Sequence, residues 1–203
     1  NVSASKKHNL ANINKTPEET VAGFAENVDL ALENGLEVSG SISMPFGSPW
    51  EGVIPIKDVE EIVEAYLRVG IKEISLSDAA GVATPRQVYD ICSSMQKKYP
   101  DVKWWLHFHN TRGMAMANIL ASMEAGITNF DSSLGGFGGC PFVPGAAGNV
   151  STEDVVHMMD EMGIKTGIDI LKLIELSRNL QDMLGNEGDS YILKAGRTKD
   201  LFK

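Results

Sequence analysis

The chain has 203 residues, which is enough for one well-filled domain and short for two. Hydrophobic residues make up 43% and charged residues 22%, the composition of an ordinary globular protein. Lysine and arginine together number 18 against 27 aspartates and glutamates, so the formal net charge is -9. This charge repels phosphate backbones and argues against nucleic-acid binding, and the apolar runs are too short to span a membrane.

The sequence contains two cysteines, Cys92 and Cys140, which form neither a C-x-x-C motif nor a disulfide framework. Asn1 is not followed by the basic, apolar and small-residue pattern of a targeting sequence. We therefore expect a protein of a reducing, cytoplasmic compartment.

Strand and helix signals alternate along the chain. Val- and Ile-containing stretches bounded by turn residues predict strands at 36–44, 71–77, 102–109 and 127–132, and the end of a further strand at 1–5. Between and after them, capping residues, prolines and terminal glycines predict helices at 16–34, 55–70, 84–99, 113–126, 151–163 and 169–184.

This alternation predicts an α/β fold with a parallel sheet, either open and doubly wound or closed into a (β/α)₈ TIM barrel. The first strand is not followed by the G-x-G-x-x-G turn of an open Rossmann sheet. Polar residues instead gather at the carboxyl ends of the strands, where barrel enzymes have their sites, so we favour the barrel. A complete barrel takes roughly 250 residues. We therefore expect a single partial barrel domain over residues 1–203 that lacks about the first three βα units.

His107 and His109 are separated by one residue on a predicted strand, so both side chains point to the same face. Two neutral imidazoles at the carboxyl rim of a barrel make half a site for a divalent metal. The alternative is a pair of histidines hydrogen-bonded to neighbouring strands. His8, in a predicted loop, and His157, on a predicted helix, have no metal-ligand spacing, and we expect both at the surface.

The segment GGFGGCPFVPGAAGN at 135–149 holds six glycines and two prolines around Cys140. Glycines at this density allow positive φ and bring backbone N–H groups close to a ligand. A cysteine on such a loop is suited to proton transfer or covalent chemistry, whereas Cys92 lies in an apolar helical pattern typical of a core thiol. Asn149 ends the loop either as a turn or cap residue or as an oxygen ligand of a metal.

These motifs resemble those of the 3-hydroxy-3-methylglutaryl-CoA lyase (HMG-CoA lyase) family of metal-dependent TIM-barrel lyases. The resemblance rests on HFHNTRGMAMANILASMEAGITNFDSSLGGFGGCPFVPGAAGNVSTED at 107–154, SLSDAAGVATP at 75–85 and FGSPWEG at 46–52, and it covers nearly the whole chain. It implies a divalent cation, Mg²⁺ or Mn²⁺, and an acyl-CoA substrate. A homo-oligomer, such as a dimer, is a further expectation.

The resemblance also implies roles for individual residues. His107, His109 and Asn149 match metal ligands, and His107 and Cys140 match residues that take part in the chemistry. Asp78 matches an aspartate near the active site, although a turn former at a strand end is the alternative. The remaining candidates, for the substrate, the loop and the surroundings of the metal, are Ser41, Ser43, Gly139 and Glu153. Glu153 has the alternative of a helix-start acid.

The reaction implied is cleavage of 3-hydroxy-3-methylglutaryl-CoA, or a close 3-hydroxyacyl-CoA analogue, to acetyl-CoA and acetoacetate. The alternatives are a Claisen-type condensing synthase of the same barrel group, a biotin-linked carboxyltransferase and a non-catalytic barrel fragment. The cysteine loop argues against the synthase, and the absence of lysine among Ser41, Ser43, Trp105 and His107, the interior-facing candidates, argues against the carboxyltransferase. The family's D-R-E elements, an aspartate ligand and an arginine, have no counterpart, so we expect this chain alone to be inactive.

Overall fold

The structure is a computed structural model that describes residues 1–143 and 145–202. The chain divides into two compact units. Unit 1 comprises Asn1–Asp131 and Cys140–Ala146, and unit 2 comprises Ser132–Gly139 and Ala147–Lys203. The expectation of a single domain stays a prediction. Within the described ranges, no helix is long and apolar enough to cross a membrane.

Unit 1 contains a sheet of five parallel strands whose spatial order equals their order in the chain. The strands are β1 (Val2–Ser3), β2 (Gly40–Ser43), β3 (Glu73–Asp78), β4 (Lys103–Phe108) and β5 (Phe130–Asp131). Each lies within or beside a predicted strand, and the α/β class with a parallel sheet is confirmed. The prediction for β2 began too early, because Leu36 at its predicted start is 60% exposed and precedes the paired residues.

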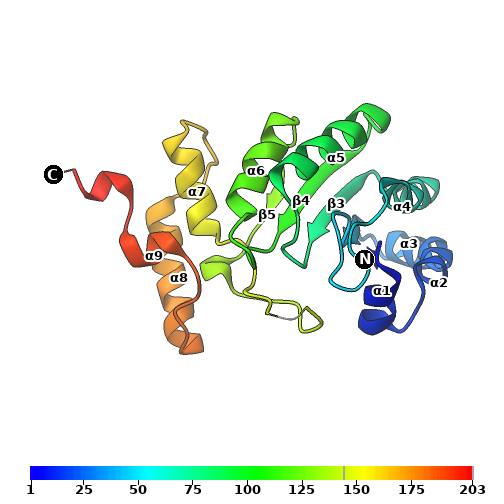
Figure 1. The fold of residues 1–203 in the computed structure, drawn as a ribbon, viewed down its shortest axis with the longest axis horizontal. Coiled ribbons are helices and arrows are strands. Elements are labelled where there is room, and N and C mark those ends of the chain that lie inside the picture. Colours follow the sequence, from blue (N-terminus) through cyan, green and yellow to red (C-terminus); the bar gives the residue numbers. More distant parts are fainter. Residues whose placement is uncertain (144, 203) are drawn as a thin grey trace. The chain divides into compact units, whose positions relative to one another are not determined.

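Six helices are described in unit 1 (Figure 1). They are α1 (Lys6–Ile13), α2 (Pro17–Ala22), α3 (Phe24–Glu33), α4 (Ile56–Arg68), α5 (Pro85–Lys98) and α6 (Ala115–Glu124). Helices α4, α5 and α6 each connect one strand to the next, which is the crossover that parallel pairing requires. Their apolar residues, such as Val59, Val88 and Ile119, are buried.

Two expectations for the first third of the chain are wrong. The helix predicted over 16–34 is interrupted at Gly23, which separates α2 from α3. The segment before it is helical rather than a loop, because the Ser5 hydroxyl accepts a hydrogen bond from His8 N (3.1 Å) and caps α1. The start of α2 is as predicted, with a capping box between Thr16 and Glu19.

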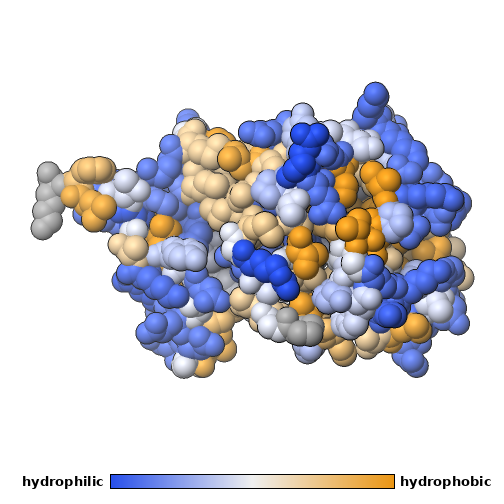
Figure 2. All heavy atoms as spheres, viewed as in Figure 1, coloured by the Kyte–Doolittle hydropathy of each residue, from blue (hydrophilic) through white to orange (hydrophobic). Residues whose placement is uncertain are grey.

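The strands of unit 1 separate an apolar face from a polar face. In β4, Trp104, Leu106 and Phe108 are buried, whereas Trp105 and His107 are half-buried on the opposite face. On the surface seen in Figure 2, hydrophilic residues predominate and apolar residues are scattered among them. The alternation therefore positions polar side chains on one face of the sheet, and the core lies on the other.

Unit 2 is helical and has its own small core of Val156, Ile170 and Leu173. Its elements are η1 (Leu134–Gly136), α7 (Thr152–Glu161), α8 (Ile170–Leu184), α9 (Tyr191–Ala195) and η2 (Thr198–Asp200). The buried Asp154 carboxylate joins two of them, since it accepts hydrogen bonds from Ser190 Oγ (3.0 Å) and Ile192 N (2.9 Å) at the start of α9.

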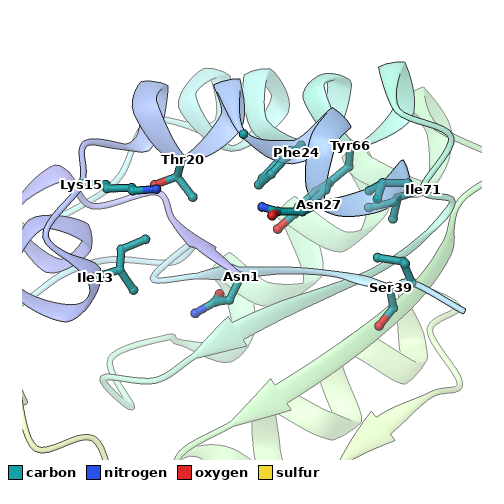
Figure 3. Close-up of a pocket in the computed structure, with 12 residues that line it drawn as sticks. Asn1, Ile13, Lys15, Thr20, Phe24, Asn27, Ser39, Tyr66 and Ile71 are labelled. Atoms are coloured by element: carbon teal, nitrogen blue, oxygen red, sulfur yellow. The ribbon is translucent and has the colours of Figure 1, made fainter. Parts of the chain in front are cut away.

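A cavity of about 350 Å³ lies in unit 1 against Asn1, Phe24, Ser39 and Tyr66 (Figure 3). Asn1 precedes β1 and Ser39 precedes β2, so this cavity is at the amino ends of the strands. In a parallel barrel the chemistry takes place at the carboxyl ends. The cavity is therefore at the wrong edge of the sheet for an active site.

Candidate active site

Two rows of side chains cross the polar face of the sheet in register. One row consists of Ser41, Ser75 and Trp105, and the other of Ser43, Ser77 and His107. The second row is nearer the carboxyl ends of the strands. Ser41 and Ser43 therefore share a face with His107, and the Ser43 hydroxyl donates a hydrogen bond to Asn1 Oδ1 (3.1 Å).

His107 and His109 project from the carboxyl end of β4 and lie beside each other. Their ring centroids are 5.2 Å apart at an interplanar angle of 60°. His109 is 8% exposed, and its Nδ1 is buried without a hydrogen-bond partner in the described part of the chain. Burial, with a smaller contribution from His107, lowers the pKa of His109 to about 4. His109 is therefore neutral at physiological pH, the state in which an imidazole binds a metal.

Asp131 is a carboxylate that sequence reasoning missed. It lies on β5 directly in register with His107 on β4 and is exposed. It also lines a cavity of about 240 Å³ with Ser75 and Trp105, which places it on the polar face. The signal was present in the sequence, since Asp131 occupies the end of the last predicted strand.

Asp78 is fully buried at the end of β3 and holds the turn that follows the strand. Its Oδ1 accepts a hydrogen bond from Val82 N (3.0 Å) and its Oδ2 one from Ala83 N (2.9 Å). Burial raises the pKa of this carboxyl, and the backbone N–H donors and Arg112 oppose that rise. These contacts are those of a turn former, the alternative role considered above. A direct part for Asp78 in the chemistry stays a prediction.

Cys140 packs over the carboxyl ends of two neighbouring strands of its own unit. It contacts an apolar cluster of Met44, Ala80 and Val143, of which Met44 follows β2 and Ala80 follows β3. Met44 has a φ of 60°, a left-handed conformation that is strained for a residue with a long side chain. Such strain is concentrated at functional sites. Cys140 is half-buried, and Gly139 before it is exposed.

The expectation that His8 lies at the surface is wrong. The side chain is 3% exposed, because α1 turns it inward, and its Nε2 is 3.8 Å from Cys140 Sγ. His157 on α7 is half-buried, with its Nε2 3.3 Å from Thr198 Oγ1.

In unit 2, the side chains of Asn149 and Glu153 are fixed by backbone groups. Asn149 Nδ2 donates hydrogen bonds to Phe137 O (2.7 Å) and Gly138 O (3.1 Å), which leaves its buried Oδ1 without a partner among the described residues. Glu153 is fully buried, and both its carboxylate oxygens accept from Gly135 N, at 3.0 and 3.1 Å. Glu153 thus holds the first turn of the glycine-rich segment, and Ser177 Oγ donates to the same carboxylate.

The residues present fit a divalent metal in part. His109 Nδ1 in unit 1 and Asn149 Oδ1 in unit 2 are each buried without a hydrogen-bond partner among the described residues, and each is an atom type that can bind a metal. The described residues contain no group of three or more His, Cys, Asp or Glu side chains that could hold a metal ion. The candidate ligands are therefore imidazole nitrogens and an amide oxygen.

Comparison with known proteins relates this geometry to a class of enzymes. Residues 1–180 match the HMGL-like family. A hydroxymethylglutaryl-CoA lyase of Bacillus subtilis is 39% identical over 184 residues, or 91% of this chain and 62% of the relative. An (R)-citramalyl-CoA lyase of Chloroflexus aurantiacus is 38% identical over 195 residues, or 96% of this chain and 62% of the relative. The chain thus spans about 62% of the length of these curated relatives.

A solved structure matches the whole chain. The HMG-CoA lyase from Acinetobacter baumannii, in complex with coenzyme A and 3-methylmalate, has a TM-score of 0.94 and 46% sequence identity. The match covers 100% of this chain and 66% of that one. The fold is therefore of the TIM-barrel type, as predicted. The chain belongs to the HMGL-like family.

Proposed function

We propose that the protein is a carbon–carbon lyase that cleaves 3-hydroxy-3-methylglutaryl-CoA, or a close 3-hydroxyacyl-CoA analogue, to acetyl-CoA and acetoacetate. The observation that supports this most is the arrangement within unit 1. His107 and His109 lie at the carboxyl end of β4, and Cys140 packs over the residues that follow β2 and β3. A base and an acid are thus available at one edge of one sheet.

The reaction divides into two proton movements. A nearby base, His107 or an aspartate, takes the proton of the tertiary hydroxyl, and the electron pair left on oxygen forms the new carbonyl as the carbon–carbon bond breaks. The Cys140 thiol then gives its proton to the carbon of the acetyl-CoA enolate. The cysteine loop excludes water from the enolate during this second step.

We assign the divalent cation, Mg²⁺ or Mn²⁺, to His107 and His109, with Asn149 as a third ligand on the strength of the resemblance. When bound, the cation lowers the pKa of the substrate hydroxyl. The unpartnered His109 Nδ1 and Asn149 Oδ1 favour this assignment. Ser41, Ser43 and Gly139 remain candidates for substrate contact, whereas Asp78 holds a turn of unit 1 and Glu153 holds a turn of unit 2.

Two acyl groups are considered for the substrate of this proposal. One relative is named for 3-hydroxy-3-methylglutaryl-CoA and another, 38% identical, for (R)-citramalyl-CoA. Both compounds are CoA thioesters with a tertiary hydroxyl and a distal carboxylate. We give priority to the first, because hydroxymethylglutaryl-CoA lyases recur among the relatives.

The test uses the full natural chain, purified and supplied with Mg²⁺ or Mn²⁺. We expect acetoacetate and acetyl-CoA from 3-hydroxy-3-methylglutaryl-CoA, with a lower kcat/KM for citramalyl-CoA. The reverse ranking would assign the protein to citramalyl-CoA. No cleavage of either thioester would contradict the lyase, and condensation of acetyl-CoA with an oxo acid would favour the synthase.

The proposal also covers the partner, the oligomeric state and the compartment of the enzyme. Acyl-CoA is its expected partner, and Lys6, Lys7, Lys72 and Arg112 are cations that could meet the CoA phosphates. Lys6 forms an ion pair with Glu18 (3.0 Å). Arg112 donates to Ala80 O (3.0 Å), which leaves Lys7 and Lys72 as candidates. We propose a cytoplasmic homo-oligomer, although the relatives include mitochondrial as well as cytoplasmic enzymes.

A further inference from the structure

Cys140 has a neighbour that none of the steps above uses. Its Sγ lies 3.8 Å from Nε2 of His8, a residue 132 positions earlier in the chain. This distance is within the range of a hydrogen bond to sulfur. Both residues belong to unit 1, so the contact is internal to one compact body.

The backbone and the ring of His8 each have a contact of their own. Ser5 Oγ accepts from His8 N (3.1 Å) at the cap of α1, and the same hydroxyl lies 3.0 Å from Ser48 Oγ. Ser48 Oγ in turn accepts from Trp50 N (3.2 Å), and the Trp50 ring stacks on the His8 ring at 5.8 Å and 28°. The cap of α1 therefore positions the His8 backbone, and the Trp50 ring packs against the imidazole.

The ring is neutral and incompletely satisfied. Burial is the sole cause acting on the pKa of His8, which it lowers, and no carboxylate or cation contributes. With the side chain 3% exposed, its Nδ1 is buried and has no partner among the described residues. The described residues supply neither a charged partner nor a second hydrogen bond that would explain why a histidine occupies this position. Within the described residues, the hydrogen-bond contact found for its ring is the one with the Cys140 thiol.

We propose that His8 is a positioning residue for Cys140, and that its Nε2–H donates a hydrogen bond to the sulfur when the loop is closed. The inference rests on the proposed function for its role in turnover. As Cys140 protonates the enolate, the S–H bond breaks, a C–H bond forms, and the electron pair remains on sulfur. The Nε2–H bond stabilises this thiolate until water returns a proton to it.

The test measures the alkylation of Cys140 by iodoacetamide as a function of pH in the full natural chain, read by peptide mass spectrometry. In His8→Phe, which keeps an aromatic ring beside Trp50 but has no donor, we expect the profile to move to higher pH by about one unit. Alkylation near neutral pH then falls roughly tenfold. In His8→Gln, whose amide nitrogen can replace Nε2, we expect most of the wild-type profile. An identical profile in wild type and His8→Phe would overturn the proposal.

Three measurements make the result decisive. His157→Phe, which changes a histidine of unit 2, should leave the profile unchanged. If His8→Phe does not fold, the His8 ring is followed by NMR in wild type and Cys140→Ala, and an unchanged His8 titration would contradict the contact. In steady state, His8→Phe should lower kcat and leave KM unchanged, with partial recovery in His8→Gln. Alkylation needs no substrate, so the failure of the lyase proposal would leave the thiol–imidazole result standing.

Discussion

His109 and Cys140 belong to the same unit, yet the surrounding chain holds them in different ways. His109 follows a six-residue strand paired along its length with β3, and its N–H donates to Asp78 O (3.2 Å). Cys140 lies in an irregular segment with turn hydrogen bonds, such as Val143 N to Cys140 O (3.1 Å), and it packs against the cluster of Met44, Ala80 and Val143. The proposed metal ligand is therefore tied to a strand, whereas the proposed acid lies in an irregular segment, and segments with fewer backbone hydrogen bonds open more readily.

The largest expected effect on activity is that of replacing His109. His109→Ala removes one of two adjacent imidazoles, and loss of a metal that polarises the substrate costs several kcal/mol of transition-state stabilisation. We expect kcat/KM to fall by roughly 10³–10⁵-fold, together with a loss of Mn²⁺ affinity in calorimetry. His157→Ala is the control and should change neither. Unaltered Mn²⁺ affinity in His109→Ala would remove the histidine from the metal site.

The next effect separates the two cysteines. Cys140→Ser should lower kcat by about 10²–10⁴, the usual contribution of a positioned acid, with little change in stability. Cys92 is 1% exposed within α5, and burial raises its pKa to about 12, so it is inert as an acid. Cys92→Ala should therefore destabilise the fold and leave turnover largely intact. Equal kcat values in Cys140→Ser and wild type would leave the loop as a lid only.

The glycine-rich segment offers a smaller, matched comparison of two positive-φ glycines. An alanine at Gly148 (φ 112°) would place its Cβ 2.5 Å from Gly136 O, whereas at Gly145 (φ 69°) nothing lies within 4 Å. We expect Gly148→Ala to lower the free energy of unfolding by about 2–3 kcal/mol and Gly145→Ala by about 1 kcal/mol. Chemical denaturation measures both. Equal costs would show that the segment relaxes freely at both positions.

The smallest effect concerns Glu153. Burial raises its pKa, so the folded state holds this proton more tightly than the unfolded state does. That contribution to stability is complete below about pH 4.5 and is lost as the pH rises through the folded value. Relative to wild type, Glu153→Gln should gain stability as the pH rises from 4.5 towards neutrality. The exposed Glu161→Gln on the same helix should show no such trend.

The sequence predicted the presence of the strands and helices better than their first and last residues. The three longer predicted strands at 36–44, 71–77 and 102–109 contain β-branched or aromatic residues, whereas the strand at 1–5 was inferred from the short segment NVSAS that precedes the first helix signal. The α1 helix was missed because its low apolar content, with Lys6, Lys7 and Asn9, has no amphipathic period; the signal was the Ser5 cap. Gly23, a helix breaker by propensity, marked the interruption between α2 and α3 that a continuous prediction overlooked.

For the site, residue spacing predicted only how side chains of a single strand lie relative to one another. The H-x-H alternation placed His107 and His109 on one face, as the structure has them. The contact between His8 and Cys140 joins two segments that only the fold brings together, so no spacing rule could have indicated it. Asp78 and Glu153 were identified as polar and near the site, but their partners are backbone N–H groups of turns, which single residue types do not reveal.

The order of the strands in unit 1 has a consequence for synthesis. Each strand pairs with the one made just before it, and a helix separates β2 from β3, β3 from β4 and β4 from β5. Parallel pairing is non-local and forms slowly, but a chain that emerges from the ribosome amino terminus first always finds its partner strand already present. At any moment during synthesis, the strand translated last is the one that presents a new sheet edge for pairing. Growth of the sheet can therefore keep pace with translation, without waiting for distant sequence.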